Sequence, residues 1–463
     1  MLRLGAGLLI FCSLGLAILS TSLDSEVSSI SSYLFAFYGL ISLGFVGYFL
    51  GIRFSKGGQR ELWLIGLVAI LIRLIMGFSE PILETDPYRY IWDGQNVIHG
   101  ISPYAESPQV AFEHGRIPGG EAYLEEKISI FRKINYRHIP TIYPAIAQYL
   151  FGISQWLSPW SLTGWRIEVF FAELGIIVGL ALLLNIFKLP IQSIIIYAWN
   201  PLVIKEFSNS LHLDVFAILG CVWALYFWSK GKDRGLWLCL LFAVLIKWYA
   251  ILLVPIFLAH QLSEKKGMRL YWPCITIVLA YLCYLPLSSS AGSIFDGTRA
   301  FAYNWQVNDS FFSIILVAYE SFTWITNANF LARLSSALIL VCIILFSSYR
   351  QYRNPDTQAG LRRMAGIILA TFFLAPTGNP WYYLWVFPWL VIQPSRLWLL
   401  FSGLVFLYYV DFYCMQDMTS TLCYDLIRCI EYGILLAYFG YIQIWKNKKQ
   451  KLASSSHFLM KLS

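Results

Sequence analysis

The segment ETDPYRYIWDG, residues 84–94, places carboxylates among aromatic side chains a few residues after an apolar run that is long enough to cross a bilayer. Glu84 and Asp86 are separated by a single residue. Two carboxylates at this spacing are the minimum for general-base chemistry, in which one takes a proton from a hydroxyl while its neighbour adjusts the pKa. The structural alternative is that Asp86 caps a helix, because Asp is a strong N-cap and Pro87 suits a first helical turn.

A helix is expected over residues 87–99, and it gives the neighbouring charges a structural interpretation. Arg89 and Asp93 are four residues apart and can form an ion pair on one helix face. His99 followed by Gly100 is typical of a helix end. The apolar face of this helix indicates that it lies in the membrane interface.

Three further segments place polar and aromatic side chains at the ends of apolar runs: NPLVIKEFSNSLHLDVF, IKWY and APTGNPWYY. Polar residues at membrane depth are costly and are usually retained for a task. Each also has a structural alternative: His212 as a satisfied core residue, Lys205 paired with Glu206, and Trp381 with Tyr382 in an aromatic belt. Together these types suit a sugar phosphate, because aromatic faces stack on sugars, carboxylates bind hydroxyls and lysine binds phosphate.

The composition predicts an all-α polytopic membrane protein. Of the 463 residues, 58% are hydrophobic and only 13% are charged. A membrane helix needs about 20 mainly apolar residues, and such windows recur along the whole chain, so we expect about 12–14 transmembrane helices. Soluble folds are excluded.

The net charge of +8 comes from short basic clusters between apolar runs, which is typical of cytoplasmic loops. The clusters are Arg53/Lys56/Arg60, Lys230/Lys232/Arg234, Lys265/Lys266/Arg269, Arg350/Arg353/Arg362/Arg363 and Lys446/Lys448/Lys449/Lys451. Membrane lipids with anionic headgroups are the expected partners of these clusters, and no nucleic-acid partner is expected.

With these clusters inside, the loop of Asp24 and Glu26 and the segment 79–164 lie outside, and the latter becomes a large first outer loop. Parity then requires that 142–157 and 311–326 lie on the outer surface as interfacial helices. We divide the chain into two N-terminal transmembrane helices (1–60), a core (61–394), C-terminal transmembrane helices (395–445) and a basic cytoplasmic tail (446–463).

Cysteine usage and soluble-enzyme motifs add little. Cys414 and Cys423 flank a short polar loop and can either form a disulfide in an oxidising compartment or stay unpaired. No His/Cys cluster has zinc spacing, and no nucleotide-binding glycine loop or nucleophile elbow is present. The N-terminal apolar stretch is interpreted as the first membrane helix rather than a signal peptide.

Taken in order, ETDPYRYIWDG…GISPY, IPTIYPAIAQYLF, NPLVIKEFSNSLHLDV, KWYAILLVPIF and PWYYLWVFPWL resemble the motifs of the C-type integral membrane glycosyltransferase superfamily. They are most similar to its bacterial polyprenyl-phosphate-mannose-dependent mannosyltransferases. The resemblance covers about residues 61–394. The two preceding helices are an addition to the shared core, and the usual YPP reads YPA at Tyr143–Ala145.

The resemblance implies roles for individual residues. Glu84 and Asp86 take the place of the superfamily's acidic motif, with Asp86 as the base that deprotonates the acceptor. Lys247 would contact the donor phosphate, and His212 and Asp214 would line the site. It implies no cofactor and no metal, although two carboxylates can hold a divalent ion.

We therefore expect a multi-pass glycosyltransferase of the plasma (inner) membrane, with an extracytoplasmic active site and a cytoplasmic C-terminus. It would transfer a sugar, mannose by resemblance, from a polyprenyl-phosphate donor to a lipid or glycan acceptor. The alternatives are a transporter or flippase, and a non-catalytic subunit of an envelope assembly complex. The expected substrate-binding residues are Tyr88, Arg89, Trp92, Asp93, Tyr104, Tyr143, Lys205, Asn209, His212, Asp214, Lys247, Tyr249, Trp381 and Tyr382.

Overall fold

The chain is helical throughout the part that the structure describes, as predicted. The computed structural model describes residues 1–22, 30–120, 122–264, 271–289, 292–414 and 420–459. Within these ranges the β-structure is limited to one isolated bridge, between Val307 and Thr377. The predicted basic cluster Lys265/Lys266/Arg269 and the acidic residues Asp24 and Glu26 lie outside the described residues.

Four described helices are long and apolar enough to cross a membrane: α1 (Leu2–Ser20), α2 (Ile30–Phe54), α8 (Thr163–Ile186) and α17 (Ala328–Arg353). A fifth span is obtained if Pro201–Asn209 and Asp214–Ser229, which are bent by 118° at a short break, count as one. The chain is thus an α-helical membrane protein. The expected total of about 12–14 spans stays a prediction.

Most of the other predicted spans form shorter or broken helices. α3 (Gln59–Gly77) is as long as α1 but carries more charge, including Arg73 in its buried face. The remaining helices of the apolar segments are α9 (Ile195–Ala198), α10 (Pro201–Val203), η2 (Ile204–Asn209), α11 (Asp214–Ser229), α12 (Asp233–Val244), η3 (Trp248–Leu253), α13 (Val254–Ser263), α14 (Tyr271–Tyr284), α16 (Phe311–Glu320), α18 (Thr357–Leu374), α19 (Pro380–Tyr383) and α20 (Phe387–Ile392). Short helices of this kind are tolerated at membrane depth where protein surrounds them.

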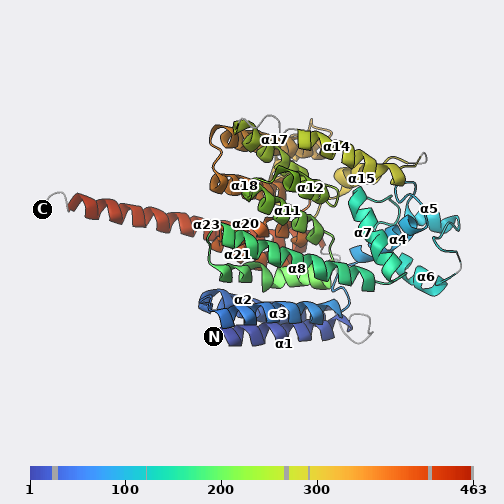
Figure 1. Cartoon of the computed structure of the whole chain (residues 1–463), viewed down its shortest axis with the longest axis horizontal. Helices are drawn as coiled ribbons and strands as arrows, with labels where there is room; N and C mark the ends of the chain where they lie inside the picture. The colour runs from blue at the N-terminus through green and yellow to red at the C-terminus, as the bar shows by residue number, and fades with distance from the viewer. Residues whose placement is uncertain (23–29, 121, 265–270, 290–291, 415–419, 460–463) are drawn as a thin grey trace. The chain divides into compact units, whose positions relative to one another are not determined.

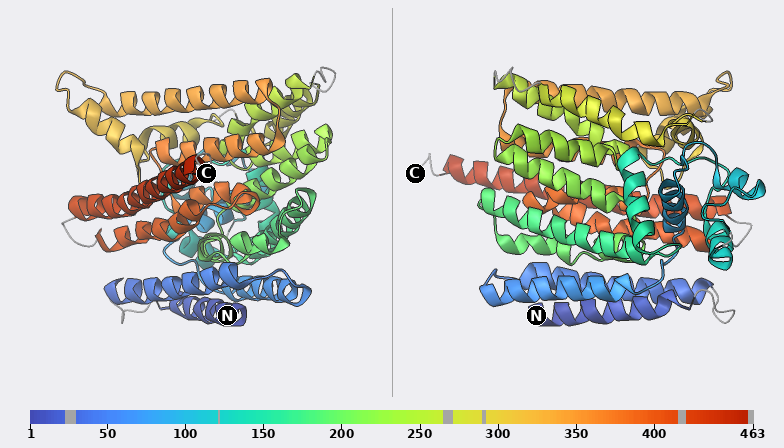
Figure 2. Two further views of the ribbon diagram at one scale, coloured as in Figure 1. Left: turned by 90° about the vertical axis from the view of Figure 1, so that its left-hand side faces the viewer. Right: turned by 45° about the vertical axis from the view of Figure 1, so that its right-hand side comes forward.

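Within residues 1–393, the long helices run roughly parallel to one another, as Figures 1 and 2 show. The helices of the predicted outer loop gather at one end of this bundle. They are α4 (Asp86–Ile98), α5 (Pro108–Glu113), α6 (Leu124–Lys133) and α7 (Ala145–Leu157). The arrangement brings α4 to the same end as the last turn of α3 and the first turn of α8.

α4 and α7 pack closely because each contributes a glycine to the contact. A Cβ added at Gly94 would lie 2.2 Å from the carbonyl oxygen of Phe151, and one at Gly152 would lie 2.9 Å from Val97 Cγ1. At Gly94 only glycine permits this approach to the backbone of Phe151, whereas at Gly152 a side chain would require Val97 to shift. This contact fixes α4, and with it Asp86 at its first residue.

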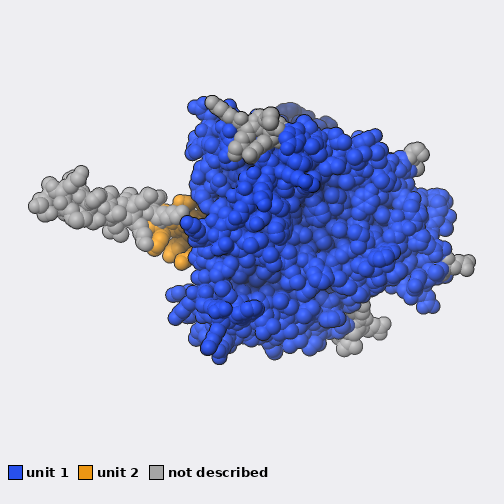
Figure 3. Space-filling view, in the orientation of Figure 1, with its two compact units in different colours: residues 1–393 blue, residues 394–463 orange. Residues whose placement is uncertain are grey.

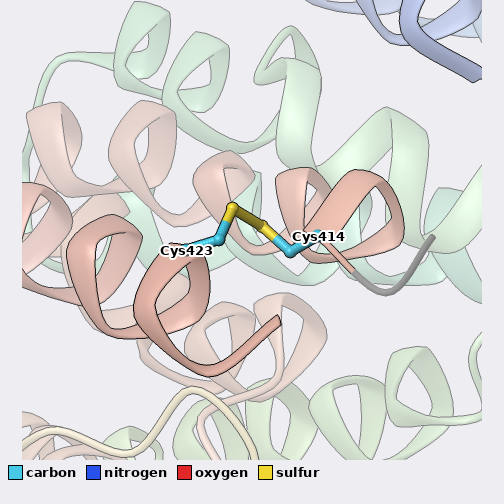
Figure 4. Close-up of a disulfide and its surroundings, with 2 residues drawn as sticks. All are labelled: Cys414 and Cys423. Atoms are coloured by element: carbon cyan, nitrogen blue, oxygen red, sulfur yellow. A yellow bond between two sulfur atoms is a disulfide. The ribbon is translucent and has the colours of Figure 1, made fainter. Parts of the chain in front are cut away.

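The chain divides into two compact units, Met1–Gln393 and Pro394–Ser463, which Figure 3 distinguishes by colour. The second unit contains α21 (Arg396–Leu404), α22 (Asp411–Cys414) and α23 (Ser420–Leu459). In this unit a disulfide joins Cys414 to Cys423 (Figure 4). The sequence left this disulfide and a pair of free thiols as alternatives, and the structure has the disulfide.

Candidate functional site

A break between η2 and α11 sets the centre of the candidate site. The chain winds as a π-helix over Ile204–Asn209, and Leu211 then takes a left-handed conformation with φ 59°. π-Helical turns of this kind often occur at functional sites, because they redirect side chains within a helix. The break leaves the side chain of His212 fully buried.

His212 lies between three carboxylates. Its Nε2 is 3.7 Å from Glu84 Oε1 and 3.4 Å from Glu206 Oε2, and its Nδ1 is 3.7 Å from Asp86 Oδ2. The ring stacks on Trp381 at 3.8 Å between centroids and an interplanar angle of 15°. Within the described part of the chain, neither ring nitrogen has a hydrogen-bond partner. We call these five residues, from Glu84 to Trp381, the His212 cluster.

Asp86 is the first residue of α4, but its carboxylate is not used for capping. Thr85 occupies the N-cap position and makes no side-chain cap bond. Asn135 Nδ2 instead donates a hydrogen bond of 2.9 Å to Asp86 Oδ1. One oxygen of Asp86 is therefore held by an amide while the other faces His212.

Glu84 is fixed by the segment that leads into α4. Asn209 Oδ1 accepts from the backbone N–H of Ile82 (2.9 Å), and Asn209 Nδ2 donates to Ser79 Oγ and to the carbonyl of Glu80 (2.7 Å each). The side chain of Glu84 is only 7% exposed. Burial raises the pKa of Glu84 above its ordinary value, and the nearby His212 and Lys205 partly oppose that shift.

A second group of contacts holds Lys247 close to the His212 cluster. Lys247 Nζ is 3.2 Å from Asp214 Oδ2, and Asp214 Oδ1 accepts a 2.6 Å hydrogen bond from Trp385 Nε1. The ammonium lies 4.8 Å from the ring centroid of Tyr382, which is a cation–π distance. The lysine side chain remains 15% exposed. It is a positioned cation that an anion can still reach.

Aromatic rings line the approach to Lys247. Tyr249 stacks on Trp385 at 3.9 Å between ring centroids, and Tyr382 stacks on the same indole at 4.6 Å. The ring of Tyr143, from the predicted outer loop, lies 5.9 Å from Lys247 Nζ. The structure thus gathers four of the predicted aromatic residues, Trp381 included, around the two charged groups.

Arg89 and Asp93 pair with each other rather than joining the cluster. Arg89 Nε lies 2.8 Å from Asp93 Oδ1, and both side chains are buried. Arg89 Nη1 also donates to the carbonyl of Ile139 at 3.1 Å. This is the ion pair that the spacing allowed as the structural alternative, and it ties α4 to the rest of the predicted outer loop.

Trp92 and Tyr104 belong to the packing of the predicted outer loop. Trp92 is buried against Phe131 and Trp160. Tyr104 is buried and donates through its hydroxyl to the carbonyl of Tyr143 at 2.8 Å. The Trp92 ring contacts Phe131 and Trp160 and the Tyr104 ring contacts Tyr284, so direct contact with a sugar remains a prediction for both.

Of three more predicted residues, Lys205 and Asn209 lie beside the His212 cluster and Tyr88 lies further out. Lys205 Nζ is 3.5 Å from Glu206 Oε2, and both side chains are fully buried. Asn209 holds the segment before Glu84, as described above. Tyr88 lies at the periphery, where Lys133 Nζ is 3.4 Å from its hydroxyl.

A divalent cation is chemically compatible with part of the cluster. Glu84, Asp86 and His212 each offer a ligand atom, and these atoms lie within 4.8 Å of one another. Two carboxylates with one imidazole suit Zn²⁺ or Mn²⁺. Because the two nitrogens of His212 face different carboxylates, a protonated imidazole would supply one positive charge between them without a metal.

Sequence reasoning missed three residues of the site. Glu206 lies in NPLVIKEFSNSLHLDVF, where the sequence indicates only that it can pair with Lys205. Trp385 stands in PWYYLWVFPWL, where aromatic spacing alone does not indicate which ring meets Asp214. Asn135 has no local signal, because only tertiary structure brings it to Asp86.

Neither any protein-family model nor any curated protein matches this chain. The site must therefore be interpreted from its own chemistry. It combines a carboxylate held by an amide, a histidine between carboxylates, a partly accessible lysine and stacked aromatic rings. This set can accept a proton, pair with an anion and bind an apolar ring face.

Proposed function

We propose that this protein is an integral membrane glycosyltransferase that transfers a sugar, mannose by resemblance, from a polyprenyl-phosphate donor to a lipid or glycan acceptor. Transfer takes place at the extracytoplasmic face of the plasma (inner) membrane. The observation that carries the proposal is the state of Asp86. Its carboxylate is free of the cap, is held by Asn135 and lies beside His212, as a positioned base requires.

In the proposed reaction, Asp86 takes the proton of the acceptor hydroxyl while that oxygen attacks the anomeric carbon of the donor sugar. The bond between this carbon and the phosphate oxygen breaks, and the electron pair leaves with polyprenyl phosphate. Lys247 pairs with the charge that grows on the phosphate. Attack opposite the leaving group inverts the anomeric configuration.

Glu84 and His212 adjust the charge around the base. His212 has carboxylates on both sides, and a protonated imidazole there would balance part of their charge. Trp381 and Tyr382 are positioned to stack on the apolar face of a sugar. We expect transfer without a metal ion, and a chelator should leave the rate unchanged.

The test is transfer from a polyprenyl-phosphate sugar in isolated membranes, comparing Asp86→Asn with Asp296→Asn. Asp296 is the matched control, because it is also the first residue of a helix, α15 (Asp296–Asn304), and its carboxylate contacts Ser293 and Arg299 rather than the His212 cluster. Loss of a general base lowers rates about 10²- to 10⁴-fold, and we expect that loss only for Asp86→Asn. If both variants transfer sugar at the wild-type rate, Asp86 is not the base.

A transporter or flippase is the second candidate, and the bent pair favours it. Discontinuous helices like Pro201–Asn209 and Asp214–Ser229 bind substrates and ions in many transporters. The two candidates differ in product. A transporter returns the lipid-linked sugar chemically unchanged on the other side of a vesicle membrane, whereas the proposed enzyme consumes it and forms a new glycoside.

A further inference from the structure

A cavity of about 230 Å³ lies between α3 and α8, apart from the groups at Asp86 and Lys247. Most of its lining is apolar and includes Leu74, Phe78, Ile167, Phe170 and Phe171. The volume is several times the roughly 30 Å³ that a water molecule occupies in the liquid. On α8 the lining runs from Thr163 to Glu173, about 15 Å along a helix axis. It has room for a segment of one hydrocarbon chain.

The rim of this cavity faces the membrane. Phe78 is 85% exposed, Phe171 is 64% exposed and Ile167 is 46% exposed. α8 is long and apolar enough to be a membrane span, so these side chains meet lipid rather than water. The surrounding medium therefore supplies lipid chains, and no other described part of the protein covers the rim.

A cation stands at one end of the cavity. Arg166 lies in the first turn of α8 and donates through Nη2 to the carbonyl of Ser79 at 2.8 Å, with Glu80 Oε1 at 3.4 Å. Its Nε is buried and has no hydrogen-bond partner within the described residues. The Arg166 side chain is 20% exposed, and a partly exposed guanidinium at the end of a membrane helix is suited to a lipid phosphate, which would compete with Glu80 for it.

The inner wall of the cavity is linked to the candidate site. Arg73 and Glu173 form a buried ion pair there, with Arg73 Nε 2.9 Å from Glu173 Oε1, and Ser208 Oγ donates to Glu173 Oε2 at 2.6 Å. Ser208 is followed by Asn209, which holds the segment from Ser79 to Ile82. A lipid at Arg166 would therefore have its headgroup beside the segment that carries Glu84 and Asp86.

We propose that this cavity binds one acyl chain of the acceptor, an anionic membrane lipid whose phosphate pairs with Arg166. The role of this lipid as the acceptor rests on the proposed function. Its binding to the cavity can be measured without any sugar transfer. Lys247 has its own contacts with Asp214 and Tyr382. The two lipid phosphates of the reaction thus have separate cations.

The experiment uses the full-length protein in phosphatidylcholine nanodiscs that contain a little phosphatidylglycerol with a photoreactive diazirine in its acyl chain. Gly77→Leu fills the cavity, and Gly66→Leu is the matched control on the same helix. A Cβ added at either glycine meets no atom within 4 Å, and Gly77 lines the cavity whereas Gly66 does not. Arg166→Gln is the third variant and removes the phosphate partner.

We expect crosslinks on peptides that contain residues 74–78 and 166–171 of the wild type. Gly77→Leu should lower this labelling about tenfold or more, and Gly66→Leu should leave it unchanged. Arg166→Gln should reduce labelling by the anionic probe to the level of a matching phosphatidylcholine probe.

Three results would overturn the inference. Equal labelling of Gly77→Leu and Gly66→Leu would show that the probe reacts as ordinary surrounding lipid and not from within the cavity. Equal labelling by anionic and zwitterionic probes would show the same. Displacement of the probe by a polyprenyl phosphate but not by excess unlabelled phosphatidylglycerol would assign the cavity to the donor. A wild type that binds the probe as expected but transfers no sugar would overturn the proposed function and leave the cavity as a lipid site.

Discussion

Asn135 donates a hydrogen bond of 2.9 Å to one oxygen of Asp86, while the other oxygen of Asp86 lies 3.7 Å from His212 Nδ1. The amide comes from the segment after α6, and the carboxylate comes from the start of α4. Two separate parts of the predicted outer loop therefore fix the direction in which this carboxylate points. An amide donor also stabilises the ionised form of the carboxylate that it contacts.

Replacing Asn135 by alanine should lower the rate of transfer with little change in KM. Hydrogen bonds to charged groups contribute about 1.5–3 kcal/mol, so we expect kcat to fall by about 10- to 100-fold. The loss should be larger for Asn135→Asp, because a second carboxylate would then repel Asp86. Steady-state kinetics with a labelled polyprenyl-phosphate sugar would measure both effects.

Asn304→Ala is the control for Asn135→Ala. Asn304 is exposed at the end of α15, and within the described residues its side chain bonds to a carbonyl of its own helix, that of Ala300. It should leave kcat unchanged. If Asn135→Ala raises KM and spares kcat, the amide contacts substrate instead of positioning the base.

The raised pKa of Glu84 predicts a pH-dependent difference in stability between the wild type and Glu84→Gln. Below the pKa of an unfolded glutamate, about 4.3, the carboxyl is neutral in both states. As the pH rises, the unfolded chain ionises first, whereas burial keeps Glu84 protonated in the folded protein until its higher pKa. The free energy of unfolding of the wild type therefore falls between the unfolded and the folded pKa of Glu84, by about 1.4 kcal/mol for each unit of difference between the two pKa values.

Glutamine is neutral at every pH and escapes this loss. We expect the melting temperature of Glu84→Gln in detergent to rise relative to the wild type as the pH increases, and the difference to level off above the folded pKa. Glu113→Gln, at an exposed position of α5, should follow the wild type throughout. If the melting temperatures of all three proteins change in parallel with pH, burial does not raise the pKa of Glu84.

The helical fold could be predicted from the sequence because hydrophobic runs of helical length are a local signal. α1 and α8 are both formed by apolar runs of this kind. The sequence places His212 between the ends of two apolar runs, but the shape of the break there could not be predicted. The π-helix and the left-handed Leu211 arise from tertiary contacts that no local pattern records.

The candidate site was predictable to the extent that its residues stand at the ends of apolar runs. Helix ends at one face of a bundle must approach one another, which is why Asp86, His212 and Lys247 could be grouped in advance. Which aromatic ring serves the site and which serves packing depends on side-chain neighbours. Trp92 and Trp385 look alike in sequence, yet the first packs in the predicted outer loop and the second binds Asp214.

The buried pair of Arg73 and Glu173 predicts a strong and non-additive stability effect. Both side chains are essentially inaccessible, and Arg73 Nη1 also bonds the carbonyls of Ala69 and Ala198. Removing either partner leaves an uncompensated buried charge, which costs about 3–5 kcal/mol. Arg73→Leu and Glu173→Leu should each destabilise by that amount, and the double variant should recover part of the loss.

Denaturant unfolding of the purified protein in micelles would measure this cycle. The pair of the exposed Arg116 and Glu106 is the control, because water screens such an ion pair and leaves it little net effect on stability. Additive effects of the two leucine substitutions would show that Arg73 and Glu173 are stabilised independently, against the paired geometry.

The disulfide between Cys414 and Cys423 predicts how many thiols react, and it also tests the proposed sidedness. The chain has nine cysteines, of which seven are free in the structure. Denatured but unreduced protein should take up seven maleimide groups by mass, and reduced protein should take up nine. Cys414→Ser should take up eight without reduction, since Cys423 then loses its partner.

Disulfides persist on the oxidising side of a membrane, so a membrane-impermeant reductant added to intact cells should release both thiols. Nine groups on unreduced protein would contradict the disulfide, and release only after the cells are broken would place this loop on the cytoplasmic side.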